Sequence, residues 1–227
     1  MTVVLCGSLG ATSAIWDGQT PALDGRRVVR VEHPGHGGAP AADVRTVGDL
    51  AQRALQLAGD GRFSFVGLSL GGAVGMRLAL SAPERLDKLV LACTSARFGE
   101  PTGWSQRAAL VRREGLEPIV DVILGRWFTP AFGAPHGFRE MFLSTDRESY
   151  ARCCDALARW DAREELGGIA TPTLVIAGEQ DPSTPPEHAE LIASRISGAR
   201  LEVIPAAAHL ANVERAEAFN RLLEEYL

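Results

Sequence analysis

A serine flanked by glycines, Gly67-Leu68-Ser69-Leu70-Gly71, follows a short apolar run and precedes small residues with helical spacing. Where a strand turns sharply into a helix, the turning residue is strained and large side chains two positions away would clash. The serine hydroxyl is then exposed beside a helix N-terminus, where unpaired amides favour a developing negative charge. This pattern predicts that Ser69 is a nucleophile, and a glycine-rich turn without chemistry is the alternative.

A serine becomes a nucleophile at neutral pH when a base accepts its proton and an acid orients that base. For a serine on such a turn, the chain order is serine, acid, histidine, with the last two on loops after late strands. Asp181 follows the apolar run 173–177, and His209 follows the run 201–204. Taken alone, Asp181 could be a turn residue and His209 a surface histidine. Because Ser69, Asp181 and His209 occur in the expected chain order and follow strands, a catalytic triad is favoured.

The tetrahedral oxyanion of acyl transfer needs two N–H donors. One is expected from Leu70, directly after the nucleophile, and the other from Ser8 in the loop CGSLG after the first apolar run. That loop is also an ordinary strand–helix turn, and both interpretations can hold together. Four further histidines lie in the wrong place for the base in this chain order: His33, His36, His136 and His188.

Alternating elements of secondary structure must position these residues. Short apolar runs predict strands at Val3–Cys6, Val28–Val31, Phe63–Val66, Leu89–Cys93, Thr173–Ala177 and Leu201–Ile204. Several of these runs are continuous, which is typical of strands covered on both faces. Helical spacing is found at Thr46–Leu57, Leu70–Ser81, Pro186–Ile196 and Glu214–Tyr226. The alternation predicts the α/β class, a mostly parallel sheet with helices on both faces.

The middle of the chain differs from the rest. Residues 99–161 contain no candidate strand but have helical stretches, Pro and Gly breaks, and the tryptophans Trp104, Trp127 and Trp160. We interpret this segment as a helical cap over the carboxyl ends of the strands, where ligands bind in open α/β sheets. The expected division is a core domain of residues 1–98 and 162–227 and a cap insertion of residues 99–161.

Composition limits the class of function. The 227 residues are 46% hydrophobic and carry a net charge of −5, with scattered arginines, so no nucleic-acid surface is expected. No apolar run could span a bilayer, and the start lacks the charged region and cleavage site of a signal peptide. The four cysteines lack metal-ligand spacing and indicate free thiols in the cytoplasm. Oligomeric state stays open.

Across its length the chain resembles the α/β-hydrolase family and, within it, the 3-oxoadipate enol-lactonases of aromatic-acid degradation. The phrases SLGATSAIWDGQTPAL and GLSLGGAVGMRLALSAPERLDKLVLACTSARFG carry this resemblance, as do PTLVIAGEQDPSTPP and AAHLANVE around the acid and the base. RWFTPAF and SYARCCDALARWD in the insertion are more discriminating, because caps diverge between activities.

The chain departs from these lactonases at two places. It starts on the strand at Val3, where most of them first have a β-hairpin, and it carries Pro34 where they usually have arginine. In some relatives a decarboxylase domain follows the lactonase, and this chain ends soon after its last predicted helix.

The resemblance implies hydrolysis of 3-oxoadipate enol-lactone to 3-oxoadipate without a metal or other cofactor. The small-molecule lactone carries a free carboxylate, for which Arg97 and then Arg126 are the candidates, with surface arginines as the alternative. Trp127 and Trp160 are candidates for the pocket wall or for simple packing.

Other functions of the same fold are a carboxylesterase, a C–C hydrolase and a slow hydrolase that serves mainly to bind a small molecule. A dehalogenase is not expected, because its nucleophile would be an aspartate at the position of Ser69.

Overall fold

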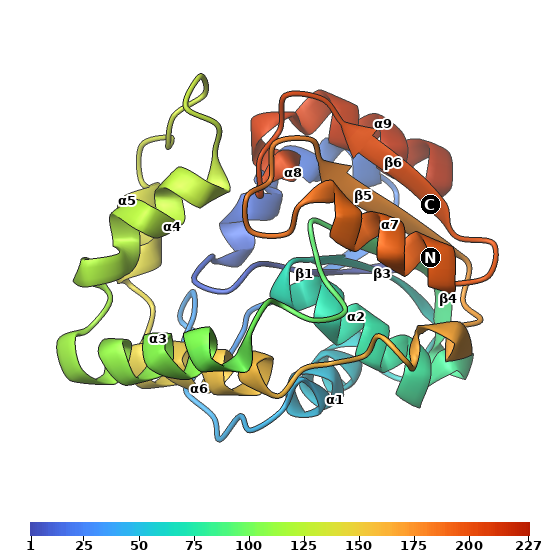
Figure 1. Ribbon diagram of the computed structural model, residues 1–227. Coiled ribbons are helices and arrows are strands. Elements are labelled where there is room, and N and C mark those ends of the chain that lie inside the picture. Colours follow the sequence, from blue (N-terminus) through green and yellow to red (C-terminus); the bar gives the residue numbers. More distant parts are fainter.

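A parallel sheet lies at the centre of the protein (Figure 1), whose computed structural model describes all 227 residues. Six strands follow in the order β2-β1-β3-β4-β5-β6, and each neighbouring pair is parallel. The strands are β1 Thr2–Cys6, β2 Arg27–Val31, β3 Phe63–Leu68, β4 Leu86–Ala92, β5 Thr173–Gly178 and β6 Arg200–Ile204. The predicted α/β class is confirmed, and the sheet is parallel throughout.

The strand boundaries follow the apolar runs closely, with β4 as the clearest difference. It begins at Leu86, three residues before the predicted Leu89, because Leu86 pairs with Phe63 of β3. It ends at Ala92 because Cys93 has a positive φ of 44° and cannot continue a strand. Every residue of β3 and β5 is buried, as their continuous apolar runs indicated.

The helices agree with the predicted ranges in the core and complete them in the cap. They are α1 Val47–Ala58, α2 Leu70–Ser81, α3 Pro101–Glu114, α4 Val120–Trp127, α5 Phe138–Leu143, α6 Arg147–Ala158, α7 Pro186–Arg195, α8 Ala211–Glu214 and α9 Ala216–Tyr226. The last predicted helix is preceded by the short α8, and the chain breaks helical geometry between them at Arg215. None of the helices has the length and apolar content needed to cross a membrane.

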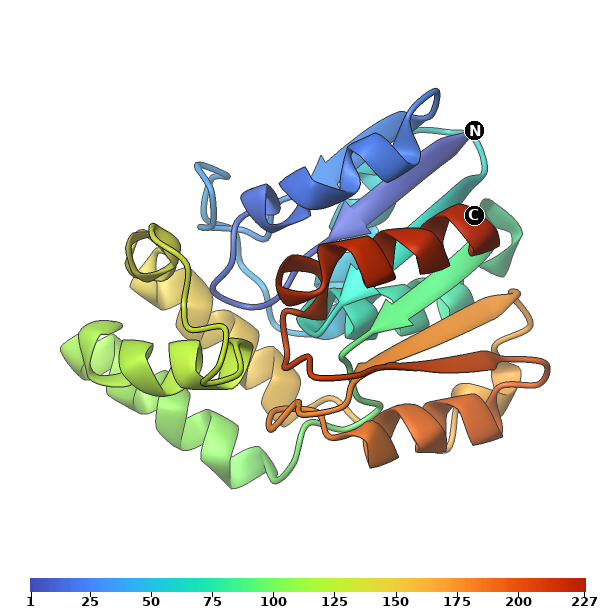
Figure 2. The same cartoon turned by 90° about the horizontal axis from the view of Figure 1, so that it is seen from above.

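Helices cover both faces of the sheet. The helix α9 lies on one face with α8 and the 3₁₀ segment η1 (Ser13–Gln19), while α1 and α2 lie on the other (Figure 1). The helix α7 packs on the two strands that flank it, β5 and β6. Both termini lie at the end of the sheet away from α3–α6 (Figure 2).

The helices α3–α6 stand at the carboxyl ends of the strands (Figure 2), as predicted for residues 99–161. One cluster of buried hydrophobic side chains includes residues of the sheet, such as Val4, and of these helices, such as Phe142 and Tyr150. We refer to α3–α6 as the cap. The division of the chain into two domains at residues 99 and 161 stays a prediction.

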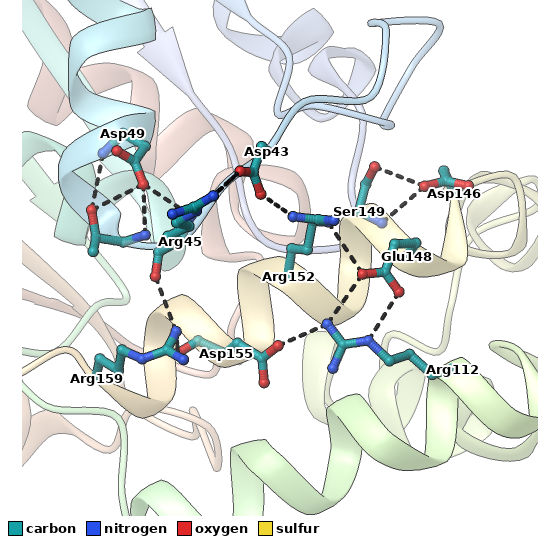
Figure 3. Close-up of polar contacts among 11 residues, drawn as sticks. Asp43, Arg45, Asp49, Arg112, Asp146, Glu148, Ser149, Arg152, Asp155 and Arg159 are labelled. Carbon is teal, nitrogen blue, oxygen red and sulfur yellow. Dashed lines mark hydrogen bonds and ion pairs between the residues drawn. The ribbon is translucent and has the colours of Figure 1, made fainter.

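One ion pair joins the cap to the core, and others join the helices of the cap to one another. Arg152 of α6 pairs with Asp43 in the loop before α1 and with Glu148 one turn away (Figure 3). Glu148 in turn pairs with Arg112 of α3 at 2.9 Å, and Arg112 also reaches Asp155 at 2.8 Å. These partly exposed charges neutralise one another. Their contribution is expected to be modest, because exposed ion pairs are typically worth about 0–1 kcal/mol each.

Candidate active site

Ser69 occupies the turn between β3 and α2 with a strained backbone. Its φ of 59° and ψ of −115° are unusual for a residue with a side chain. Hydrogen bonds hold this conformation: the Ser69 amide donates to Ala92 O at 2.9 Å, and Thr94 Oγ1 donates to Ser69 O at 2.7 Å. The turn therefore fixes the hydroxyl beside the helix N-terminus.

The two glycines of the motif are required by close backbone contacts. A Cβ atom on Gly67 would lie 2.1 Å from Gly71 O, and one on Gly71 would lie 2.0 Å from Cys6 O. A larger residue at Gly67 would therefore push β3 away from the start of α2, and one at Gly71 would push the turn away from β1. The steric reason inferred from the sequence is therefore present in the structure.

The structure brings Ser69, His209 and Asp181 into one hydrogen-bonded chain. His209 Nε2 lies 2.8 Å from Ser69 Oγ, and His209 Nδ1 lies 2.8 Å from Asp181 Oδ2. A carboxylate can only accept, so Nδ1 carries the proton and Nε2 of the neutral ring accepts from the serine hydroxyl. This is the geometry that general-base activation of a serine requires.

Asp181 is held in one orientation by its own loop. The amides of Ser183 and Thr184 donate to Oδ1 at 2.8 and 3.1 Å, and Thr184 Oγ1 donates to Oδ2 at 2.7 Å. Burial alone would raise the pKa of Asp181, but the electrostatic interaction and hydrogen bond with His209 and the hydrogen bonds from Thr184 hold this pKa below its ordinary value. The carboxylate is therefore charged at neutral pH. Thr184 was missed, although it lies three residues after the acid in DPSTPP.

The candidate oxyanion donors, Leu70 and Ser8, lie on the elements next to the nucleophile. Leu70 begins α2 directly after Ser69, and Ser8 lies in the loop after β1 and lines the same cavity as Ser69. The roles of both amides as oxyanion donors stay predictions.

Two buried histidines hold the loop that carries Ser8. His33 Nε2 donates to Gly7 O at 2.9 Å, and the Gly10 amide donates to His36 Nε2 at 3.0 Å. His36 Nδ1 donates to Pro34 O at 2.9 Å, so its ring is neutral and both nitrogens are used. Neither histidine is the base, as expected, but their positioning role was not predicted.

Acid is expected to destabilise the fold through His36. Burial and the nearby His33 lower its pKa to about 3, although the hydrogen bond to Pro34 opposes this. Between about pH 6.5 and 3 the unfolded chain therefore binds a proton that the folded chain does not, so the free energy of unfolding falls with falling pH. Each pKa unit is worth about 1.4 kcal/mol. Between pH 7 and 5, wild type should lose about 2 kcal/mol more than His36→Gln, whose amide oxygen can still accept from Gly10.

Urea unfolding of wild type and His36→Gln at both pH values measures this difference. The exposed His136 supplies a matched control, since His136→Gln should keep the wild-type pH dependence. An unchanged slope in His36→Gln would show that this histidine does not carry the acid sensitivity.

A cavity opens between the nucleophile and the cap. It holds about 510 Å³ including its mouth, and its wall contains Ser69 and His209 from the core. Of the four predicted substrate contacts, Arg126 and Trp127 line it. The sequence did not single out the cap residues that complete the wall, among them Trp104, Arg107, Ile123, Tyr150 and Leu157.

Arg97 and Trp160 do not line this cavity, which corrects their predicted roles. Arg97 pairs instead with Glu100 at 3.0 Å, although its neighbour Phe98 lines the cavity. Trp160 is buried beneath the cap, where its Nε1 donates to Ser95 O at 3.0 Å and Arg77 lies 5.4 Å from its ring centre. Proximity in sequence to a strand end was not a sufficient criterion for Arg97, and an aromatic side chain in the insertion was not one for Trp160.

Glu214 joins the cap to the loop that carries the base. Its buried carboxylate accepts from the Ala208 amide at 2.9 Å and from the hydroxyl and amide of Thr129. The Leu210 amide donates to Trp127 O at 2.9 Å beside it. The position of His209 is thus coupled to the end of α4, a connection between residues far apart in sequence.

Known proteins are similar to this chain in sequence and in structure. The sequence profile of the alpha/beta hydrolase fold matches residues 2–216. The chain is 35% identical to 3-oxoadipate enol-lactonase 2 of Acinetobacter baylyi, over 98% of this chain and 86% of that protein.

Solved structures are similar over nearly the whole chain. A hydrolase from Pseudomonas aeruginosa PA01 superimposes with a TM-score of 0.94 at 40% identity, covering 99% of this chain and 89% of that one. The enol-lactonase from Burkholderia xenovorans LB400 gives a TM-score of 0.94 at 35% identity, covering 99% and 90%. The fold and the family relationship therefore rest on both sequence and structure.

Proposed function

The chain belongs to the α/β-hydrolase family, and from this premise we propose that it is a serine hydrolase that opens the lactone ring of 3-oxoadipate enol-lactone. The observation that carries the proposal is the Ser69–His209–Asp181 chain at the base of a cavity lined by Arg107 and Arg126. The likeness to proteins named enol-lactonases supports the choice of substrate.

In the first half of the proposed reaction, Ser69 Oγ attacks the lactone carbonyl while His209 Nε2 accepts the hydroxyl proton. The amides of Leu70 and Ser8 stabilise the oxyanion, and loss of one such donor typically costs about 2.7–4 kcal/mol of transition-state stabilisation. The carbon–oxygen bond of the ring then breaks. The leaving oxygen is that of an enol, a better leaving group than an alkoxide, and it takes the proton from His209.

In the second half, His209 accepts a proton from water, and the resulting hydroxide attacks the acyl-enzyme carbonyl. Collapse of this second tetrahedral species releases the carboxylate product and returns the proton to Ser69. The enol tautomerises to the ketone, which makes ring opening favourable overall. Asp181 keeps His209 Nδ1 protonated through both halves. No step requires a metal or other cofactor, and the buried free thiols favour a cytoplasmic setting.

Spectrophotometric turnover of chemically generated enol-lactone tests the proposal directly. We expect a kcat/KM for the enol-lactone at least about 100-fold above that for neutral p-nitrophenyl esters, since binding energy from the free carboxylate adds to that of the acyl group. The same panel should include an unrelated carbamate and a vinylogous acid cleaved by C–C hydrolases, because relatives also include putative carbamate hydrolases and a methyl ester esterase. A higher kcat/KM for one of those substrates would show that it, and not the enol-lactone, is the substrate.

A further inference from the structure

The wall of the Ser69 cavity carries positive charge without a matching negative charge. Its lining residues include Arg107 and Arg126 but no aspartate or glutamate. Asp181 lies behind the ring of His209, and its side chain is fully buried. A substrate in this cavity therefore meets two guanidinium groups and no carboxylate.

Neither of these arginines forms an ion pair within the protein, unlike several other arginines of the cap. Arg112 and Arg152 are paired with acidic side chains on α6 and in the core (Figure 3). Arg97, the residue favoured by the sequence, is paired with Glu100. No acidic side chain lies within ion-pair distance of Arg107 or Arg126, so both guanidinium groups are available to an anion.

Arg107 is held in place while Arg126 is not. Its guanidinium lies over the ring of Trp104, 4.5 Å from the ring centre, one helical turn away on α3. Trp104 is itself fixed, because its Nε1 donates to Phe98 O at 2.5 Å. Arg107 and the buried Tyr150 line the same cavity, and burial raises the pKa of the Tyr150 hydroxyl, so that hydroxyl stays neutral. Arg107 is half-buried, whereas Arg126 is exposed on α4.

We propose that Arg107 binds the free carboxylate of the substrate, with the Tyr150 hydroxyl beside it, and that this site selects small lactones or esters that carry a second, anionic end. A half-buried, pre-oriented guanidinium binds a carboxylate more strongly than an exposed one, because solvent screens it less and less side-chain freedom is lost. The exposed Arg126 attracts the anion electrostatically but does not bind it at a fixed position. This inference deepens the proposed function and rests on it for the identity of the substrate.

The first experiment compares an anionic and a neutral substrate on the same variants. Arg107→Met should lower kcat/KM for the enol-lactone by about 10- to 100-fold, the usual value of a charge-assisted hydrogen bond. Its effect on p-nitrophenyl acetate, which has no carboxylate, should be much smaller. Arg126→Met should cost less than Arg107→Met and lose its effect at high salt. Arg97→Met is the matched control, since an ion-paired arginine outside the cavity should leave both substrates unaffected.

The second experiment does not depend on the enol-lactone. Adipate should inhibit p-nitrophenyl acetate hydrolysis competitively, and its inhibition constant should rise at least about 10-fold in Arg107→Met. Arg107→Lys keeps the charge and should restore part of the affinity. The neutral diamide of adipic acid should bind wild type and Arg107→Met equally.

The outcomes separate the two claims. If wild type fails to hydrolyse the enol-lactone but adipate inhibition still depends on Arg107, the proposed substrate is wrong and the anion site stands. Equal losses of Arg107→Met on both substrates, or adipate inhibition that is absent or insensitive to Arg107, would overturn the anion site. A larger loss of kcat/KM for the enol-lactone in Arg126→Met than in Arg107→Met would also overturn the anion site.

Discussion

Replacement of Ser69 by alanine is expected to lower turnover of every ester or lactone substrate by about ten-thousandfold or more. Ser69 Oγ is the atom that His209 Nε2 contacts at 2.8 Å, and the alanine variant has no group to attack the carbonyl. The fold should remain, because the hydroxyl lies at the cavity wall and the strained backbone of residue 69 is fixed by bonds to Ala92 and Thr94 that an alanine keeps. Initial rates on p-nitrophenyl acetate and on the enol-lactone, with thermal unfolding of the same samples, measure both statements.

The double variant Ser69→Ala with His209→Ala gives a second readout of the same prediction. If the two residues act as one unit, the double variant should be hardly slower than either single variant. Losses that multiply would mean that His209 has a separate task. More than about one hundredth of the wild-type rate in Ser69→Ala would rule out Ser69 as the nucleophile, since loss of a triad member costs far more than that.

The chemistry of the core could be predicted because each reactive residue follows an apolar run directly. Ser69, Asp181 and His209 come immediately or shortly after β3, β5 and β6, and the carboxyl ends of parallel strands meet at one edge of the sheet. Local pattern and chain order were therefore sufficient to bring together residues up to 140 positions apart.

The wall of the cap could not be predicted in the same way. Which face of α3 turns toward Ser69 depends on its packing against α6, and that packing is set by contacts between helices rather than by either sequence alone. Trp104 and Arg107 share a face at i, i+3 spacing, which was a signal in principle, but nothing local indicates that this face lines the cavity. Arg97 follows a strand end in the sequence, but in the structure it pairs with Glu100 and does not line the cavity.

The contacts that support the site could not be predicted from local sequence patterns either. His36 and Glu214 are polar residues in motifs with other plausible roles, and each acts on backbone amides, at Gly10 and Ala208, on loops that carry functional residues. Hydrogen bonds to main-chain groups leave no pattern in side-chain types. Their partners therefore become visible only when the loops are placed in three dimensions.

Asp181→Asn is expected to lower kcat by about ten-thousandfold, as loss of the orienting carboxylate does in other serine hydrolases. The reason lies in the loop around it. The amides of Ser183 and Thr184 both donate to Oδ1, so the asparagine oxygen will stay at that position and its NH₂ group will face His209. An N–H donor opposite Nδ1 turns the ring into the tautomer that is protonated at Nε2, and this nitrogen can no longer accept the proton of Ser69.

Thr184→Ala is the matched control for this prediction. The Thr184 hydroxyl donates to the same carboxylate oxygen as His209, at 2.7 Å, but it does not decide which nitrogen of the ring is protonated. Its loss removes one hydrogen bond to a charged group, worth about 1.5–3 kcal/mol, part of which appears as lost stability. We therefore expect a decrease in kcat of at most about tenfold, with a lower melting temperature.

The two variants together distinguish tautomer control from simple support of the loop. Steady-state kinetics and thermal unfolding of both variants should give a large kcat loss with a small stability change for Asp181→Asn, and the reverse for Thr184→Ala. If Asp181→Asn keeps more than about a tenth of the wild-type kcat, His209 must hold its tautomer through another acceptor. Thr184 Oγ1, at 3.4 Å from His209 Nδ1, is the one neighbour placed to serve as that acceptor, so Asp181→Asn combined with Thr184→Ala would then remove the remaining activity.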